Sequence, residues 1–272
     1  SKSKKNISFV FANPSFELER EIISEAQPIK SSFELNNSQI RSIDLGDLKW
    51  ASLPGTEKEG KIIADTISAR LLVKDKATAK EIINIKNPRI LHIASHSFYL
   101  NKQEKNINSF KNLLKFKYSK PLNYFANNEN PLLRSGVVLA GANNPELKKD
   151  DDGYLTAFEI SQLDWNGTEL VVISGCESGS GDVKNGEGIY GLKRAISVAG
   201  AKSSLLSLWK VDDQATAVFM KSYYERLVAG EGRAKALINT QREFRNHKNE
   251  NYRHPHIWAA FQLSGDWRPI DF

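Results

Sequence analysis

The chain is short of cysteine and has no long apolar run. Its 272 residues include a single cysteine, Cys176, so no disulfide can form within the chain. The sequence has neither an N-terminal apolar signal segment nor a stretch of eighteen apolar residues, which argues against a secretion signal and a membrane span. These absences predict a protein of the reducing cytoplasm. The first residue is Ser1 rather than Met, as in a domain cut from a longer protein.

Motifs that bind phosphate, nucleic acid or metal are also missing. The net charge is +6, and residues 101–120 carry six lysines against one acid. Without a glycine-rich phosphate loop or an aromatic RNA-binding motif, we interpret this stretch as a solvated face, with a docking surface for an acidic partner as the alternative. Nucleic acid is not expected to bind directly. One cysteine and scattered histidines lack the paired spacing of a zinc site, and we expect no cofactor.

What is present is the pattern of a folded α/β protein. Hydrophobic residues make up 40% of the chain and charged residues 26%. Apolar runs typical of strands covered on both faces alternate with segments of helical periodicity. The strands are expected at 7–12, 89–95, 136–141, 169–174 and 203–209, and the helices at 55–71, 188–198 and 213–228. Thr56 and Glu59 are predicted to form a capping box on the first helix.

This alternation predicts a mostly parallel central sheet with helices on both faces. We expect one domain over residues 1–272, with an N-terminal lobe of about 1–85 and a catalytic lobe of about 86–272. A Lys- and Asn-rich insertion is expected at 101–130.

Two of the predicted strands end in residues that can do chemistry. His96 follows the strand 89–95, and Cys176 follows the strand 169–174. Loops at the carboxyl ends of parallel strands converge on one crevice, where a thiol and an imidazole can act as nucleophile and base. The alternatives are a small buried cysteine and a structural histidine.

Several blocks of the chain, in order, resemble a CHAT domain. That family is a caspase-like, separase-like peptidase domain often found with TPR repeats. The similar segments are PRILHIASHSFYL (88–100), NPLLRSGVVLAGAN (130–143), DDGYLTAFEI (151–160), VVISGCESGSGDVKNGEGIYGLKRAISVAGAKSSLLSLWKVDD (171–213) and HPHIWAAFQLSGDW (254–267). The resemblance implies a caspase-like fold for nearly the whole chain.

The resemblance also implies roles for individual residues. His96 corresponds to the catalytic histidine and Cys176 to the nucleophile, and the backbone N–H groups of Ser97 and Cys176 would hold the oxyanion. Two positions depart from the family pattern: Ser97 replaces the usual glycine after the histidine, and Gly175 replaces the alanine or serine that commonly precedes the cysteine.

The segment LWKVDD (208–213) resembles the separase segment whose acid lines the pocket for a P1 arginine. On this reading Asp213 is the acid of the P1 pocket, and Asp151 and Asp152 are weaker candidates. Lys210 replaces an aspartate of that pattern. The alternative is that Asp212 or Asp213 only caps the following helix.

The predicted function is a cysteine endopeptidase that cleaves a dedicated protein partner after a basic residue, regulated by a TPR region or partner. A catalytically silent interaction module and a Cys-His acyl hydrolase are the alternatives.

Overall fold

The protein is built around a six-stranded sheet. The computed structural model describes residues 6–18, 49–99, 131–144, 151–175 and 187–272. The strand order is β2-β1-β3-β7-β8-β9, and all neighbours are parallel except β8 and β9. The strands are β1 (Phe9–Ala12), β2 (Arg70–Val73), β3 (Ile90–Ala94), β7 (Leu170–Ile173), β8 (Ser203–Ser207) and β9 (Phe261–Gly265). The expected α/β fold with a mostly parallel sheet is confirmed.

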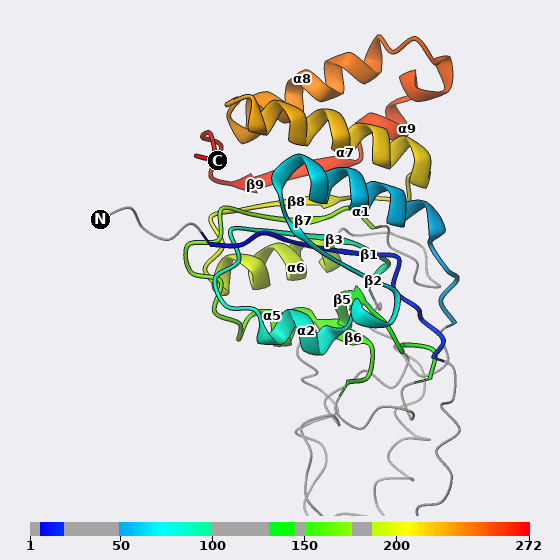
Figure 1. Ribbon diagram of the computed structural model, residues 1–272, viewed down its shortest axis with the longest axis vertical. Helices are drawn as coiled ribbons and strands as arrows, with labels where there is room; N and C mark the ends of the chain where they lie inside the picture. Colours follow the sequence, from blue (N-terminus) through cyan, green and yellow to red (C-terminus); the bar gives the residue numbers. More distant parts are fainter. Residues whose placement is uncertain (1–5, 19–48, 100–130, 145–150, 176–186) are drawn as a thin grey trace, which may run out of the picture.

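Helices cover both faces of this sheet (Figure 1). One face carries α1 (Pro54–Ile67) and α7 (Asp213–Val228), with α8 (Arg233–Arg245) and α9 (Pro255–Trp258) packed outside α7. The opposite face carries α2 (Ala79–Asn84), α5 (Ala157–Ile160) and α6 (Glu187–Val198). Short 3-10 turns occupy Lys74–Lys76 (η3), Pro131–Arg134 (η4) and Glu250–Arg253 (η6).

The apolar runs are continuous because each strand contributes side chains to two cores. In β3, Ile90 packs into the core under α1 and α7, whereas Leu91 and Ile93 pack into the core against α2, α5 and α6. Successive side chains of a strand point to opposite faces, so a strand covered on both faces has no position left for a solvated residue. His92 is therefore a buried polar residue on the α1 and α7 face, and it requires a partner there.

A smaller sheet begins where β3 ends. It contains β4 (Ser97–Tyr99), β5 (Ser135–Val138) and β6 (Tyr154–Thr156), all antiparallel. The expectation that 136–141 joins the parallel sheet is wrong. Its strand, β5, pairs only with β4 and β6 in the described part of the chain. Only Ser95 and His96 separate β3 from β4, so the chain leaves the large sheet at this corner.

The predicted capping box on the first helix is also wrong. Helix α1 begins at Pro54, after Leu53, since proline at the first helical position loses no hydrogen bond that the helix needs. Thr56 lies inside the first turn, where its hydroxyl donates to the Leu53 carbonyl and accepts from the Asn13 N–H. Glu59 points into the protein and is 1% exposed.

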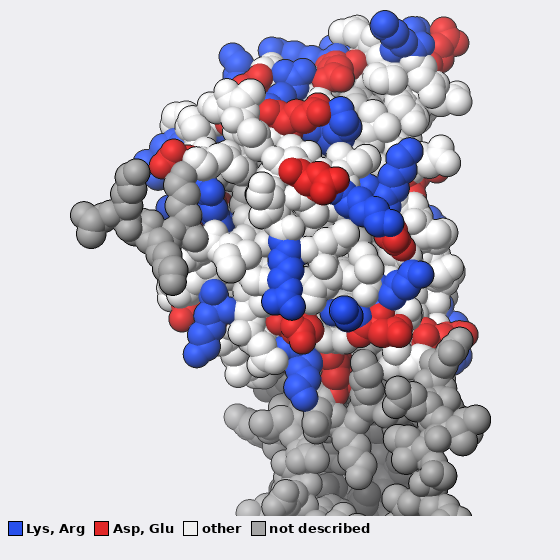
Figure 2. Space-filling model, in the orientation of Figure 1, with Lys and Arg blue, Asp and Glu red and all other residues white. Residues whose placement is uncertain are grey.

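Charges of both signs are interspersed on the face seen in Figure 2. Lysines and arginines alternate there with aspartates and glutamates, so this face has no continuous basic patch. The lysine-rich stretch 101–120 lies outside the described residues. None of the helices in the described ranges has the length and apolarity needed to cross a membrane.

Candidate functional site

Two strand ends meet at one pocket on the α1 and α7 side of the sheet. His96 follows β3, and Gly175 follows β7, its neighbour in the sheet. Both line a pocket, here called the acidic pocket, together with Leu53, Thr56, Glu59, Ser174, Lys210, Val211, Asp213 and Thr216. Cys176 lies outside the described residues, directly after Gly175. The structure thus brings His96 to the residue that precedes the cysteine.

A backbone carbonyl orients the His96 ring. The Nε2 atom of His96 lies 2.8 Å from the carbonyl oxygen of Ala51, just before α1. A carbonyl can only accept a hydrogen bond, so Nε2 carries the proton in this arrangement. In the neutral ring Nδ1 is then the basic nitrogen. The contact selects the tautomer whose Nδ1 can accept a proton.

Aromatic side chains pack around the same ring. The ring centroids of Phe16 and Trp50 lie 5.2 Å and 5.4 Å from that of His96, and His96 is 6% exposed. Burial lowers the pKa of His96, and the positive charge of Lys210 adds to this effect, while the hydrogen bond to Ala51 opposes it. The lowered pKa favours the neutral imidazole, the form that a general base needs.

Glycine at 175 is required by the close approach of the neighbouring strand end. A Cβ atom built on Gly175 would lie 1.2 Å from the carbonyl oxygen of Ser95, which no side chain can tolerate. The carbonyl of Gly175 accepts a hydrogen bond of 2.6 Å from the Ser207 hydroxyl. Glycine, in place of the alanine or serine common in the family, therefore fits the local packing. The hydrogen bond from Ser207 anchors the chain immediately before Cys176.

The serine after the histidine is compatible with its place in β4. Ser97 is absent from the described residues with positive φ, so the backbone here does not need glycine. Ser97 lies opposite Val137, and the Val138 N–H donates to the His96 carbonyl. In an antiparallel ladder this makes Ser97 and Val137 a non-hydrogen-bonded pair. The N–H of Ser97 consequently points away from β5, toward the outer edge of β4.

Asp213 lines the acidic pocket, and its neighbour Asp212 caps the helix. The Asp212 carboxylate accepts from the N–H groups of Gln214 and Ala215, both at 3.0 Å.

Asp213 is the first residue of α7 and is half-buried against Gly55. A Cβ atom added to Gly55 would lie 2.5 Å from the Asp213 Cβ. Burial raises the pKa of Asp213, as do the nearby carboxylates of Glu59 and Asp212, whereas Lys210 lowers it.

The other acidic candidates lie elsewhere. The Asp151 carboxylate accepts from the N–H groups of Lys80 and Gly153, and neither Asp151 nor Asp152 lines the acidic pocket. These contacts hold the turn before β6 against the start of α2. Both aspartates therefore lie apart from the pocket that contains His96 and Asp213.

The acidic pocket contains a second carboxylate, Glu59, that was not predicted from the sequence. Oε1 of Glu59 lies 3.0 Å from Nε2 of His92, and both side chains are almost fully buried. Nδ1 of His92 lies 3.1 Å from the Tyr224 hydroxyl. A ring with its proton on Nε2 satisfies both partners, because it donates to Glu59 and accepts from Tyr224. Glu59 belongs to the buried stripe of α1 with Ile63 and Ile67, and a glutamate on such a stripe is the signal that could have revealed it.

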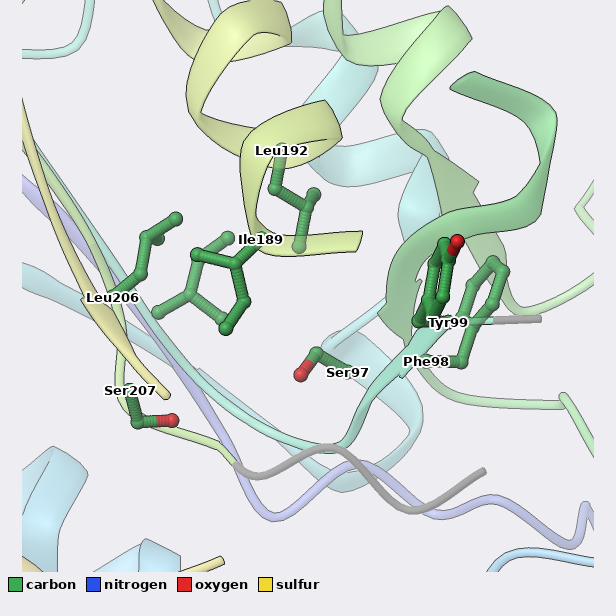
Figure 3. Close-up of a pocket in the computed structure, with 8 residues that line it drawn as sticks. Ser97, Phe98, Tyr99, Ile189, Leu192, Leu206 and Ser207 are labelled. Atoms are coloured by element: carbon green, nitrogen blue, oxygen red, sulfur yellow. The ribbon is translucent and has the colours of Figure 1, made fainter. Parts of the chain in front are cut away.

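A second pocket lies on the opposite face of the sheet (Figure 3). This apolar pocket is lined by Ser97, Phe98, Tyr99, Ile173, Ile189, Leu192, Leu206 and Ser207. In the close-up, Ile189 and Leu192 come from α6, and the Ser97 hydroxyl faces the space between them and β4. The two pockets flank the same strand ends. Within the described ranges, no group of three or more His, Cys, Asp or Glu residues could hold a metal ion.

Comparison with known families agrees with this arrangement. The model of the CHAT domain matches residues 1–266. The chain belongs to the CHAT domain family. The CHAT domain is related to caspase-like peptidases, in agreement with the mostly parallel sheet of this chain.

Two curated relatives of this CHAT domain are repeat proteins. Tetratricopeptide repeat protein 28 of Mus musculus is 24% identical over 239 residues, and that of Homo sapiens is 25% identical over 243 residues. Each match covers 85% of this chain and 9% of the relative. The chain therefore spans about a tenth of the length of these relatives.

Proposed function

We propose that this CHAT domain is a cysteine endopeptidase in which His96 and Cys176 form the catalytic dyad. The observation that carries the proposal is the acidic pocket, where an oriented imidazole, the residue before the only cysteine and two carboxylates meet. Nδ1 of His96 takes the thiol proton, and the thiolate of Cys176 attacks the scissile carbonyl. The imidazolium then protonates the leaving amine, and water hydrolyses the thioester.

The oxyanion of this reaction needs two backbone donors. The N–H of Ser97, at the outer edge of β4, is one candidate, and the N–H of Cys176 is the other. The ladder geometry supports the first assignment, because it directs the Ser97 N–H away from β5. Preorganised donors of this kind stabilise charge that develops only in the transition state.

We further propose that the substrate is a protein cleaved after a basic residue. Asp213 and Glu59 place two carboxylates in the pocket beside His96, and burial makes a charge-assisted contact with a guanidinium stronger than it would be in water. Lys210 is exposed, and its charge opposes part of this attraction. The names of the curated relatives support a TPR region or TPR partner as the regulatory element of the full-length protein.

A covalent probe tests the proposal directly. A peptide with a P1 arginine and a thiol-reactive carbonyl warhead should label the wild-type chain at Cys176, as located by mass spectrometry. Labelling should disappear in Cys176→Ala and fall at least about 100-fold in His96→Ala, because general-base assistance contributes on that scale.

Other outcomes separate the alternatives. Tight binding of the peptide without labelling would indicate a silent interaction module. Labelling that is indifferent to the peptide and responds to small acyl esters would indicate an acyl hydrolase. Peptide cleavage with the adduct on a serine would end the dyad assignment.

A further inference from the structure

The carbonyl that orients His96 belongs to a segment held by one asparagine. Ala51 follows Trp50, and the Asn143 side chain binds Trp50 in both directions. The Trp50 N–H donates to Oδ1 of Asn143 at 2.9 Å, and Nδ2 of Asn143 donates to the Trp50 carbonyl at 3.0 Å. This pair of bonds fixes the peptide units on both sides of the Trp50 Cα.

The same asparagine also holds the second ring beside His96. The backbone N–H of Asn143 donates to the Phe16 carbonyl at 2.9 Å. Phe16 and Trp50 lie more than thirty residues apart in the sequence, and Asn143 joins the two segments. Asn143 is 7% exposed, Trp50 5% and Phe16 3%, so water does not replace these bonds readily.

A second anchor acts on the Trp50 side chain. The indole N–H of Trp50 donates to the Tyr154 hydroxyl at 2.8 Å, which fixes the ring that packs against the imidazole. Asn143 lies in the connection between β5 and β6, and Tyr154 is the first residue of β6. The smaller sheet therefore supplies supports for the histidine at the end of the larger one.

We infer that Asn143 is a positioning residue that keeps His96 in the Nε2-protonated tautomer by fixing the Trp50–Ala51 backbone. Its significance for catalysis rests on the proposed function of His96. Without the Asn143 side chain, the Trp50 backbone loses both of these bonds, and the Ala51 carbonyl that follows it is no longer held in place. The neutral imidazole then distributes its proton between Nε2 and Nδ1, and the fraction with a basic Nδ1 falls.

The test compares Asn143→Ala with Asn144→Ala. Asn144 is the matched control, because it is the next residue and its side chain accepts from the N–H of Leu18 at 3.3 Å, whereas the Asn143 side chain binds Trp50. Ring nitrogen signals of labelled histidine, assigned with His96→Gln, report the tautomer at a pH where the ring is neutral. Near-UV circular dichroism checks the fold.

The wild type and Asn144→Ala should each show one protonated nitrogen, Nε2. In Asn143→Ala the two nitrogen signals of His96 should move toward each other, and kcat for a cleaved peptide should fall about 10- to 100-fold with little change in KM, as misplacement of a reacting group does. Unchanged nitrogen signals overturn the inference, whether or not kcat falls, since the loss would then not act through the imidazole.

The nitrogen signals do not depend on peptidase activity. If the wild type cleaves nothing, the proposed function fails, and the signals still decide the positioning role. If Asn143→Ala does not fold, Asn143→Asp keeps an acceptor for the Trp50 N–H and loses the amide that donates to the Trp50 carbonyl. A smaller displacement of the same two signals is expected there, and unchanged signals in that variant overturn the inference.

Discussion

The two faces of the central sheet bury different kinds of side chain. The face under α5 and α6 is filled mainly by aliphatic and aromatic residues, such as Leu91, Ile160 and Trp165. The face under α1 and α7 buries a comparable apolar core and, beside it, the polar group of Glu59, His92 and Tyr224. Burying charged groups costs free energy unless they are paired.

The position of this polar group explains why the two faces differ. Glu59 reaches from the pair with His92 to the acidic pocket, so the polar group lies against the proposed site, on one face only. We interpret the apolar face as the main source of stability, and the polar group as a feature that serves the pocket at some expense of stability. Substitutions on the apolar face should therefore change stability alone, whereas substitutions around the pocket should also change activity or specificity.

The largest effect on stability is expected from breaking the buried pair. His92→Leu leaves the Glu59 carboxylate without its partner, and it should lower the free energy of unfolding by about 3–5 kcal/mol. The double variant His92→Leu/Glu59→Leu should regain most of this loss, because a well-packed apolar pair replaces two costly polar groups. Urea denaturation of the wild type and of both variants measures these changes in the free energy of unfolding. A double variant no more stable than His92→Leu would contradict our interpretation of the polar face.

A cavity in the apolar face should affect stability alone. Ile160 in α5 is fully buried and lines neither pocket. Ile160→Ala should cost about 2–5 kcal/mol of stability, with kcat/KM per folded molecule unchanged. Thermal denaturation and active-site titration together check this expectation. A loss of activity without a loss of stability would show that the two faces are not separable in this way.

The pocket acid should change specificity with little change in stability. Asp213→Asn keeps the size of the side chain and removes its charge, so kcat/KM for a P1 arginine peptide should fall by the equivalent of about 2–5 kcal/mol. A P1 methionine peptide should be affected far less. Asp212→Ala is the matched control: the loss of its capping bonds should cost about 0.5–2 kcal/mol of stability and leave P1 preference unchanged. An unaltered arginine-to-methionine ratio in Asp213→Asn would end the pocket assignment.

The smallest expected effect concerns pH. Burial lowers the pKa of His96, and Lys210 lowers it further. A general base loses activity as the pH falls through its pKa, so the acid limb of the kcat/KM profile should lie below the ordinary histidine range. Removing the charge in Lys210→Gln raises this pKa and should move the acid limb to higher pH. Lys221→Gln, on the outer surface of α7 in a pair with Glu225, is the control and should leave the profile in place.

The sequence alone was sufficient for strands β1, β3, β7 and β8 and for helices α1, α6 and α7. The predicted helix 55–71 runs too far, into β2, and α8 and β9 were not predicted. Helix α7 spans residues 213–228 as its repeat of Ala215, Phe219, Tyr223 and Leu227 predicts, and all four are buried in one core. The apolar runs of β3, β7 and β8 were equally readable. Hydrophobic periodicity is a local property, and it states which face of an element is buried.

The same local logic predicted that His96 and Cys176 follow neighbouring strands, since the carboxyl ends of parallel strands meet at one edge. The structure brings together His96 and Gly175, the residue before Cys176. The sequence could not show which groups His96 and His92 contact. The Ala51 carbonyl lies 45 residues from His96, and Glu59 lies 33 residues from His92. Whether Asp212 or Asp213 caps α7 was equally undecided until the backbone of its first turn was in place. A sequence pattern shows that a side chain is buried, but the atom it meets there depends on how distant segments pack, and only the tertiary structure decides that.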